Sequence, residues 1–477
     1  MQVVQNVFVT LISARGRGAK TTVGAPGTLR TYISGERTML WPDTTQRSPE
    51  GIVTIGGCLV TELAARFGTP LYIFDRVTLV DRAQRMRTAF TDLYADSRIA
   101  FGGKAYLSPT ILRIHAAEGI GLDVVSAGEL WGALKAGIDP KTIVFHGNNK
   151  PADELRYALE QGIGLIALDN ADEIARLESV AAEVYGQNPA LGTMVPVALR
   201  LNPGVDVHTH AKISTGVVDS KFGFPLWDAS ARSAITQVLA SPHLTLTGLH
   251  MHLGSQLDEF DAIPVAIDRQ VELAGWLRRE HGVEISIFSP GGGAGIAYTP
   301  DGIDTDPRLW AQVITSAYLE SWQKHDVPPG EIVVEPGRWL IGPAAVALYT
   351  VGSIKPIEGV RTYVAVDGGM ADNLRPAMYD AVYTAEIANR NATGPEQAVR
   401  IAGRYCESGD VLIDNIDLPE MQVGDLIAIP AAGAYQLPMA SNYNAVPRPA
   451  VVLVNEGEAT VMRQRETYDD VFRSEVF

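Results

Sequence analysis

The chain has 477 residues, more than one hydrophobic core usually organises, so its length predicts two domains. Hydrophobic residues make up 46% and charged residues 20%, as in a globular protein, and the net charge of −16 argues against nucleic acid or an anionic membrane surface as the main partner. The two cysteines, Cys58 and Cys406, are too few for a disulfide framework or a metal cluster, which favours a reducing, cytoplasmic setting.

Residues 1–38 differ in composition from the rest of the chain. They are rich in Ser, Thr and Gly, and they contain several basic residues but a single acidic one, Glu36. This composition is faintly like a transit peptide, but the apolar stretch 7–12 is too short for a secretory core. We favour either a disordered extension or a start codon assigned too far upstream, in which case Met39 would be the first residue. No apolar run reaches the roughly 20 residues needed to cross a bilayer.

The next 300 residues or so are dominated by short apolar runs that alternate with helical patterns. The predicted strands are 98–104, 122–126, 143–147, 164–169, 195–202, 244–254, 284–292 and 331–337. Helices are predicted between most of them, for example at 108–118, 127–136 and 153–161. Continuous apolar strands that alternate with helices indicate parallel strands covered on both faces. The eightfold count favours a (β/α)8 TIM-type barrel over a doubly wound open sheet, and we place this barrel at 79–342.

After residue 342 the pattern changes to strands without regular helices between them, which predicts a β-rich C-terminal domain at 343–477. The predicted strands are 344–352, 362–367, 398–403, 426–430 and 451–454. The segment 39–78, which precedes the barrel, contains an apolar run at 71–74. We expect this segment to contribute a strand to the β domain.

Polar and glycine residues gather where the predicted barrel strands end. The carboxyl ends of barrel strands carry the chemistry in this fold. Each residue taken alone has an ordinary structural reading, as a solvated charge, a core histidine or a turn, but their convergence at one rim favours a functional site. The residues are Lys104, Asp123, Ser126, Arg200, Asn202, His250, His252, Ser255, Gly291, Gly292, Gly293, Glu335, Gly337 and Arg338.

The residue types at this rim fit a phosphorylated pyridine cofactor, pyridoxal 5'-phosphate. Glycines 291–293 allow backbone N–H groups to approach a phosphate without a Cβ in the way. Glu335 can keep a pyridine nitrogen protonated, and His252 can stack on a flat ring. Lys104 is the natural amine for a Schiff base with the cofactor aldehyde.

Five segments in order resemble the fold-type III pyridoxal-phosphate-dependent decarboxylases, which share the alanine racemase-like barrel. They read FGGKAYL, LDVVSAGEL, GLHMHLGSQ, SPGGGAGIAY and EPGR. Four further segments are similar to those of the diaminopimelate decarboxylases, and they read HTHAKISTGVVDSKFGF, DGGMADNLRPAMYDA, CESGD and AGAYQLPMASNYN. The match runs from about Met39 to the C-terminus. It implies decarboxylation of meso-diaminopimelate to L-lysine, the last step of lysine biosynthesis.

The resemblance also implies roles for individual residues. The implied cofactor contacts are Lys104 as the Schiff-base lysine, His252 against the ring, Ser255, Gly291, Gly292 and Gly293 at the phosphate, Glu335 at the ring nitrogen, and Gly337, Arg338 and Tyr435 nearby. The implied substrate contacts are Arg338, Arg375, Tyr379, Glu407 and Tyr435. Cys406 would donate the proton. In the family, the segment that holds Cys406 reaches the active site of the partner subunit, so the resemblance implies a homodimer.

One position departs from the family pattern, and several alternatives remain open. The family often has Tyr-Ala where this chain has Phe101-Gly102, so packing beside the cofactor ring is expected to be looser. The chain could instead act on another basic amino acid, or bind pyridoxal phosphate without catalysis; an alanine racemase would lack the CESGD segment. No metal is expected, because His208 and His210 have no further ligands near them in the sequence.

Overall fold

The computed structural model describes residues 40–205, 219–257 and 259–476. The predicted N-terminal extension and the pair His208 and His210 lie outside this part of the chain. Within it, no helix combines the length and the apolar character needed to span a membrane.

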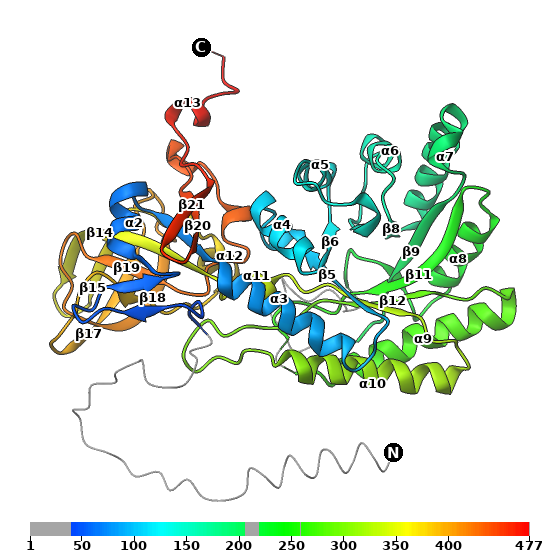
Figure 1. Ribbon diagram of the computed structural model, residues 1–477, viewed down its shortest axis with the longest axis horizontal. Helices are drawn as coiled ribbons and strands as arrows, with labels where there is room; N and C mark the ends of the chain where they lie inside the picture. Colours follow the sequence, from blue (N-terminus) through cyan, green and yellow to red (C-terminus); the bar gives the residue numbers. More distant parts are fainter. Residues whose placement is uncertain (1–39, 206–218, 258, 477) are drawn as a thin grey trace, which may run out of the picture. The chain divides into compact units, whose positions relative to one another are not determined.

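Eight parallel strands of the described chain close into a barrel, which confirms the predicted fold class (Figure 1). Closure is visible in the pairing: β8 contacts both β7 and β9, and β13 contacts both β12 and β5. The strands are β5 (Ser97–Gly102), β6 (Gly121–Val124), β7 (Ile143–Phe145), β8 (Leu165–Leu168), β9 (Val195–Asn202), β11 (Leu244–Met251), β12 (Ile287–Gly291) and β13 (Glu331–Val334). A two-residue strand, β10 (Phe224–Pro225), adds to β9.

Helices surround the barrel strands (Figure 1). They are α3 (Arg76–Thr91), α4 (Pro109–Ala117), α5 (Ala127–Lys135), α6 (Ala152–Glu160), α7 (Ala171–Gln187), α8 (Ser230–Ala240), α9 (Ala262–His281), α10 (Pro307–His325) and the short α11 (Arg338–Ile341). Strands such as β8 are buried along their whole length, because side chains on one face fill the barrel and those on the other contact the helices.

The C-terminal part of the chain forms a second, largely antiparallel sheet. Its strands are β14 (Ala345–Ile357), β15 (Arg361–Val366), β16 (Glu386–Ile387), β17 (Glu396–Ala402), β18 (Val411–Pro419), β19 (Leu426–Ile429), β20 (Ala450–Asn455) and β21 (Glu458–Arg463). The short helix α12 (Arg375–Tyr379) lies between β15 and β16, and the short helix α13 (Tyr468–Val471) follows β21. Before the barrel lie β1 (Gln46–Arg47), β2 (Val53–Ile55), β3 (Cys58–Leu59), α2 (Val60–Phe67) and β4 (Leu71–Asp75).

Strand β4 lies in the middle of this second sheet, between β14 and β20. It is buried along its whole length, although it precedes β14 by some 270 residues of barrel sequence. Strands from before and after the barrel sequence therefore pair in one sheet, and the barrel sequence lies between them.

The two longest strands that the sequence did not predict, β18 and β21, are partly exposed. β18 and β21 alternate polar and apolar residues and are partly exposed, so they lack the continuous apolar run by which the buried strands were found. Helix α3 was also missed, since its sequence is rich in Arg and its buried stripe includes Arg82. Arg82 is accommodated there by Asp304 and by the face of Trp339.

Candidate active site

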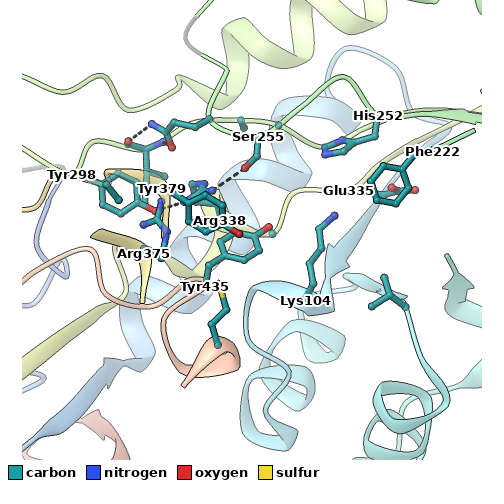
Figure 2. A pocket seen from close by; sticks show the side chains of 18 of the residues that line it. Lys104, Phe222, His252, Ser255, Tyr298, Glu335, Arg338, Arg375, Tyr379 and Tyr435 are labelled. Carbon is teal, nitrogen blue, oxygen red and sulfur yellow. Dashed lines mark hydrogen bonds between the residues drawn. The ribbon is translucent and has the colours of Figure 1, made fainter. Parts of the chain in front are cut away.

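A cavity of about 840 Å³ lies at the carboxyl ends of the barrel strands. Its size is in the range typical of sites for cofactors and small ligands. Both parts of the fold line it, since α12 and the loop after β19 contribute side chains beside those of the barrel (Figure 2). The predicted site residues that line it are Lys104, Arg200, His252, Ser255, Gly293, Glu335, Gly337, Arg338, Arg375, Tyr379 and Tyr435.

Lys104 stands in a single 3-10 turn directly after β5. Its side chain is exposed to the cavity, and Figure 2 shows it extending toward His252. Gly103 is required beside it, because a Cβ there would lie 2.8 Å from the carbonyl oxygen of Asp123. At Gly102 the nearest atom to a Cβ would be 3.5 Å away, an ordinary contact, so an alanine would fit at that position. The lysine amine is thus presented to the cavity by a tightly constrained turn.

Glu335 follows β13, and its side chain is only 7% exposed. Its Oε1 atom accepts a hydrogen bond from Ser289 Oγ at 3.1 Å and lies 3.2 Å from His146 Nε2, while Oε2 lies 2.9 Å from His250 Nε2. Burial acts to raise the pKa of Glu335, but the two histidines beside it hold the pKa well below its ordinary value. The cavity therefore contains a buried carboxylate that stays ionised.

The glycine segment after β12 is required by close backbone packing. A Cβ at Gly292 would lie 2.2 Å from the carbonyl oxygen of Glu335, and Gly293 has φ +120°. The N–H of Gly291 donates to Ser289 Oγ at 3.1 Å, and that of Gly292 donates to Nδ1 of His252 at 3.2 Å. These two glycines hold the site together rather than line the cavity, and Gly293 is the member of the predicted trio that faces it.

Two buried arginines share the other end of the cavity with Tyr298. Arg338 donates to Tyr298 Oη and to Ser255 Oγ, the latter at 2.9 Å, and its guanidinium lies 4.7 Å from the ring centre of Tyr435. Arg375 donates to Tyr383 Oη and lies 4.7 Å from the ring centre of Tyr298. Burial acts to raise the pKa of Tyr298, but the two guanidinium groups lower it below its ordinary value.

No carboxylate of the described chain forms an ion pair with either Arg338 or Arg375. Buried charges in proteins are normally paired. This end of the cavity is therefore suited to an anionic group on a bound molecule, and the planar guanidinium groups are suited to a carboxylate.

Cys406 and Glu407 do not line this cavity. They lie in the loop between β17 and β18, where Cys406 is exposed and its N–H donates to Asn444 Oδ1 at 3.0 Å. The loop is anchored by Asp410, whose carboxylate accepts from the N–H groups of Met370 and Tyr405. Of the predicted catalytic pair, only Lys104 faces the cavity of its own chain.

Two polar residues at the predicted rim have local structural roles. Ser126 caps α5 by accepting a hydrogen bond from the N–H of Glu129 at 3.2 Å, and Asn202 accepts one from the N–H of Gly204 at 3.0 Å. Polar residues at the ends of barrel strands therefore include both residues of the site and residues that satisfy nearby backbone N–H groups. The sequence alone does not distinguish the two kinds.

The sequence reasoning missed several residues of the site, including His146, Tyr298 and Tyr383. His146 directly follows β7, so the strand-end rule that selected Lys104 would also have selected it. Tyr298 lies at the end of the segment SPGGGAGIAY, which was singled out for its glycines. Tyr383 has no such signal, because it reaches Arg375 only through the turn after α12.

The cluster of His146, His250 and Glu335 is also the group within the described chain that could hold a metal ion, since its ligand atoms lie within 4.8 Å of one another. In the structure these atoms contact each other directly as hydrogen-bond partners. The arrangement is accounted for by those hydrogen bonds.

Comparison with known proteins agrees with this geometry. The family model of the pyridoxal-dependent decarboxylases, pyridoxal binding domain, matches residues 77–342. The chain is 44% identical over 430 residues to a diaminopimelate decarboxylase of Bacillus subtilis (strain 168), covering 90% of this chain and 96% of the relative. Among solved structures, a diaminopimelate decarboxylase from M. jannaschii in complex with L-lysine superposes with a TM-score of 0.85 at 33% identity, covering 92% of this chain and 99% of the other.

Proposed function

The chain belongs to the diaminopimelate decarboxylase group of the pyridoxal-dependent decarboxylases, and from this premise we propose that it converts meso-diaminopimelate to L-lysine and CO2. The observation that carries the choice of substrate is the pair of buried arginines without a carboxylate partner in the described chain. Diaminopimelate keeps a carboxylate at the end that does not react, and this group would complete the pair.

The described residues of the cavity fit pyridoxal 5'-phosphate. An exposed lysine and a buried carboxylate face the same space, and the backbone of Gly292 comes so close to the carbonyl oxygen of Glu335 that a Cβ would collide. We assign Lys104 as the residue that holds the cofactor covalently, His252 as the ring neighbour and Glu335 as the partner of the ring nitrogen. Ser255 and Gly293 are proposed at the phosphate end, with Gly337 and Tyr435 beside them; Gly291 and Gly292 support this loop. Arg338 donates both to Ser255 and to Tyr298, so we propose that it contacts both the cofactor and the substrate.

When bound, the cofactor supplies an electron sink for the bonding pair left behind as CO2 departs. The protein's part is to orient the substrate and to control protons. The Lys104 amine would hold the cofactor until the substrate amine replaces it. The Glu335 carboxylate would stabilise positive charge at the ring nitrogen throughout the reaction.

The arginine end of the cavity would bind the distal part of the substrate. Arg375 offers a planar pair of donors to the carboxylate, and Tyr379 adds a hydroxyl. The distal ammonium group needs an anion, for which we propose Glu407. A substrate such as ornithine or lysine lacks the distal carboxylate and would leave the buried arginines without their partner, which typically costs several kcal/mol.

Because Cys406 and Glu407 lie outside the cavity of their own chain, we propose that a second copy of the chain supplies them. The site would then be completed across a homodimer interface, with Cys406 of the partner subunit as the proton donor to the carbon that has lost CO2. An exposed thiol on an anchored loop, with an acid beside it, suits this role.

Release of CO2 from meso-diaminopimelate, measured with and without added pyridoxal 5'-phosphate, tests the activity directly. We expect stoichiometric CO2 and L-lysine that depend on the cofactor, and far slower release from ornithine or lysine at equal concentration. Equal turnover of ornithine would show that the arginine pair does not select the substrate.

Mixing two inactive variants tests the shared site. We expect Lys104→Ala and Cys406→Ala to be inactive alone, and their mixture to regain about a quarter of the wild-type activity, because half of randomly formed twofold dimers contain one intact site of two. A mixture that stays inactive after subunit exchange, with heterodimers confirmed by native mass spectrometry, would contradict the proposal.

A further inference from the structure

Four polar side chains meet inside the barrel beside the cavity, and Glu335 is the one of them that lines it. His146 follows β7, His250 lies in β11, Ser289 lies in β12, and Glu335 follows β13. The two imidazole rings are 4.4 Å apart, and each turns its Nε2 atom to a different oxygen of Glu335. We call these four residues the Glu335 cluster. Four strands of the barrel therefore fix the position of one carboxylate.

The protons in this cluster can be placed from the contacts. A carboxylate oxygen only accepts, so the Nε2 atom of each histidine must donate to it. The Nδ1 atoms of His146 and His250 are buried and have no hydrogen-bond partner in the described chain. A charged imidazolium would leave an N–H at Nδ1 buried without an acceptor, whereas the neutral ring leaves only a lone pair there.

Electrostatics favour the same assignment. Two charged rings 4.4 Å apart would repel each other in a buried site. Burial lowers the pKa of His250 to about 4, so this ring is neutral at neutral pH. The other charged groups that act on the cluster are Lys104, Asp123 and Arg200. The net charge on the two histidines and Glu335 is then that of one carboxylate.

We propose that His146 and His250 are positioning residues that act through Glu335. As neutral Nε2–H tautomers they donate to both carboxylate oxygens, and they keep Glu335 an anion directed at the ring nitrogen of the cofactor. This inference rests on the proposed function, since it takes Glu335 as the partner of that nitrogen.

The two histidines influence which group holds the proton between Glu335 and the ring nitrogen. Each donor to the carboxylate weakens it as a base, so a proton shared between Glu335 and a pyridine nitrogen stays on the nitrogen. A protonated ring withdraws electrons from the reacting carbon better than a neutral ring does. The two histidines thereby strengthen the electron sink without touching the substrate.

The first test needs no variant. In the wild-type protein labelled with ¹⁵N-histidine, His146 and His250 are expected to show a protonated Nε2 and a bare Nδ1 near neutral pH. Assignment of their signals comes from the single His→Gln variants. Signals of a doubly protonated ring for both residues would contradict the proposed tautomers.

The second test uses pyridoxal 5'-phosphate labelled with ¹⁵N at the ring nitrogen. His146→Phe and His250→Phe each remove one donor while keeping a ring, and we expect the ring nitrogen to lose its proton at a pH lower by about one unit for each lost donor. The value of kcat should fall about tenfold or more per variant, with KM changed much less. The Gln variants retain an N–H donor and should recover most of both properties.

His115→Phe is the matched control. His115 is a buried histidine of α4 that packs edge-on against Phe101, with the two ring centres 4.7 Å apart. It makes no hydrogen bond to Glu335 in the described chain. This variant should leave the ring-nitrogen titration unchanged.

A ring nitrogen that titrates identically in the wild type and in the folded Phe or Gln variants would overturn the inference. The titration requires bound cofactor but no substrate. A wild type that binds the cofactor with a protonated ring but releases no CO2 from meso-diaminopimelate would refute the proposed substrate alone. A wild type that binds no cofactor would overturn both.

Discussion

The barrel and the β domain contribute to the same cavity in different ways. The barrel contributes residues from strand ends, where hydrogen bonding between parallel strands fixes the backbone. The β domain contributes Arg375 and Tyr379 from the short helix α12 and Tyr435 from a loop, and it leaves Cys406 and Glu407 outside. In a barrel, topology forces the strand ends to converge, whereas loops of a sheet domain can serve either their own chain or a neighbouring one.

If the barrel carries the bond to the cofactor, the largest effect should come from Lys104. Lys104→Ala is expected to abolish CO2 release and the absorbance of bound cofactor, because it removes the amine proposed to bond covalently to the cofactor. The side chain is exposed, so the thermal unfolding temperature should change little. If the Lys104→Ala variant turned over near the wild-type rate, the proposed role of Lys104 as the cofactor-bonding residue would be wrong.

Substitutions in the β domain should mainly weaken substrate binding. Arg375→Met removes a buried guanidinium proposed to bind the distal carboxylate, and KM for meso-diaminopimelate should rise about 10-fold to 100-fold, as expected for lost hydrogen bonds to a charge. Arg390→Met is the control, because Arg390 pairs with Asp425 in the same domain without lining the cavity. An equal rise in KM in the control would mean that the domain acts through stability alone.

A smaller effect is expected where the two regions meet. Tyr298 belongs to the barrel and accepts from Arg338, while its ring lies against Arg375 of the β domain. Tyr298→Phe keeps the ring and removes the hydroxyl, so KM should rise a few-fold, in line with about 1 kcal/mol for one hydrogen bond. Tyr363→Phe, a change on β15 outside the cavity, should leave KM unaltered.

The smallest effect should be confined to the β domain's stability and its pH dependence. Burial acts to raise the pKa of Glu466, but hydrogen bonds from Arg448 lower it to about 2. A lowered folded-state pKa stabilises the protein above the unfolded value of about 4.5, and this stabilisation is lost as the pH falls toward 2.

Glu466→Gln should therefore reduce the free energy of unfolding by no more than about 1 kcal/mol at pH 7, since the pair is partly exposed to solvent. Denaturant titrations of variant and wild type at pH 7 and pH 3 would measure this difference, which should shrink at pH 3. A difference that grows as the pH falls would contradict the assignment of Glu466 as an ionised partner.

Much of the barrel side of the site could be predicted because its signals are local. The position after an apolar strand selected Lys104, His252 and Glu335, and the run of glycines marked a close backbone approach. The same rule also selected Ser126 and Asn202, which turned out to satisfy nearby backbone N–H groups. A strand end shows where a side chain can point into a site, but whether it does depends on what the next turn needs.

The sequence by itself determined the strand count of the barrel, the place of Lys104 after a barrel strand and the glycine segment, because apolar periodicity and backbone freedom are properties of short stretches of chain. Only the tertiary structure decided that β4 joins β14 and β20, that His146 and His250 meet on Glu335, and that Tyr298 lies between two arginines. It also placed Cys406 outside its own cavity. The first three of these are contacts between residues far apart in sequence, and they depend on the fold because a buried charge or strand edge needs hydrogen-bond partners that only the fold brings near.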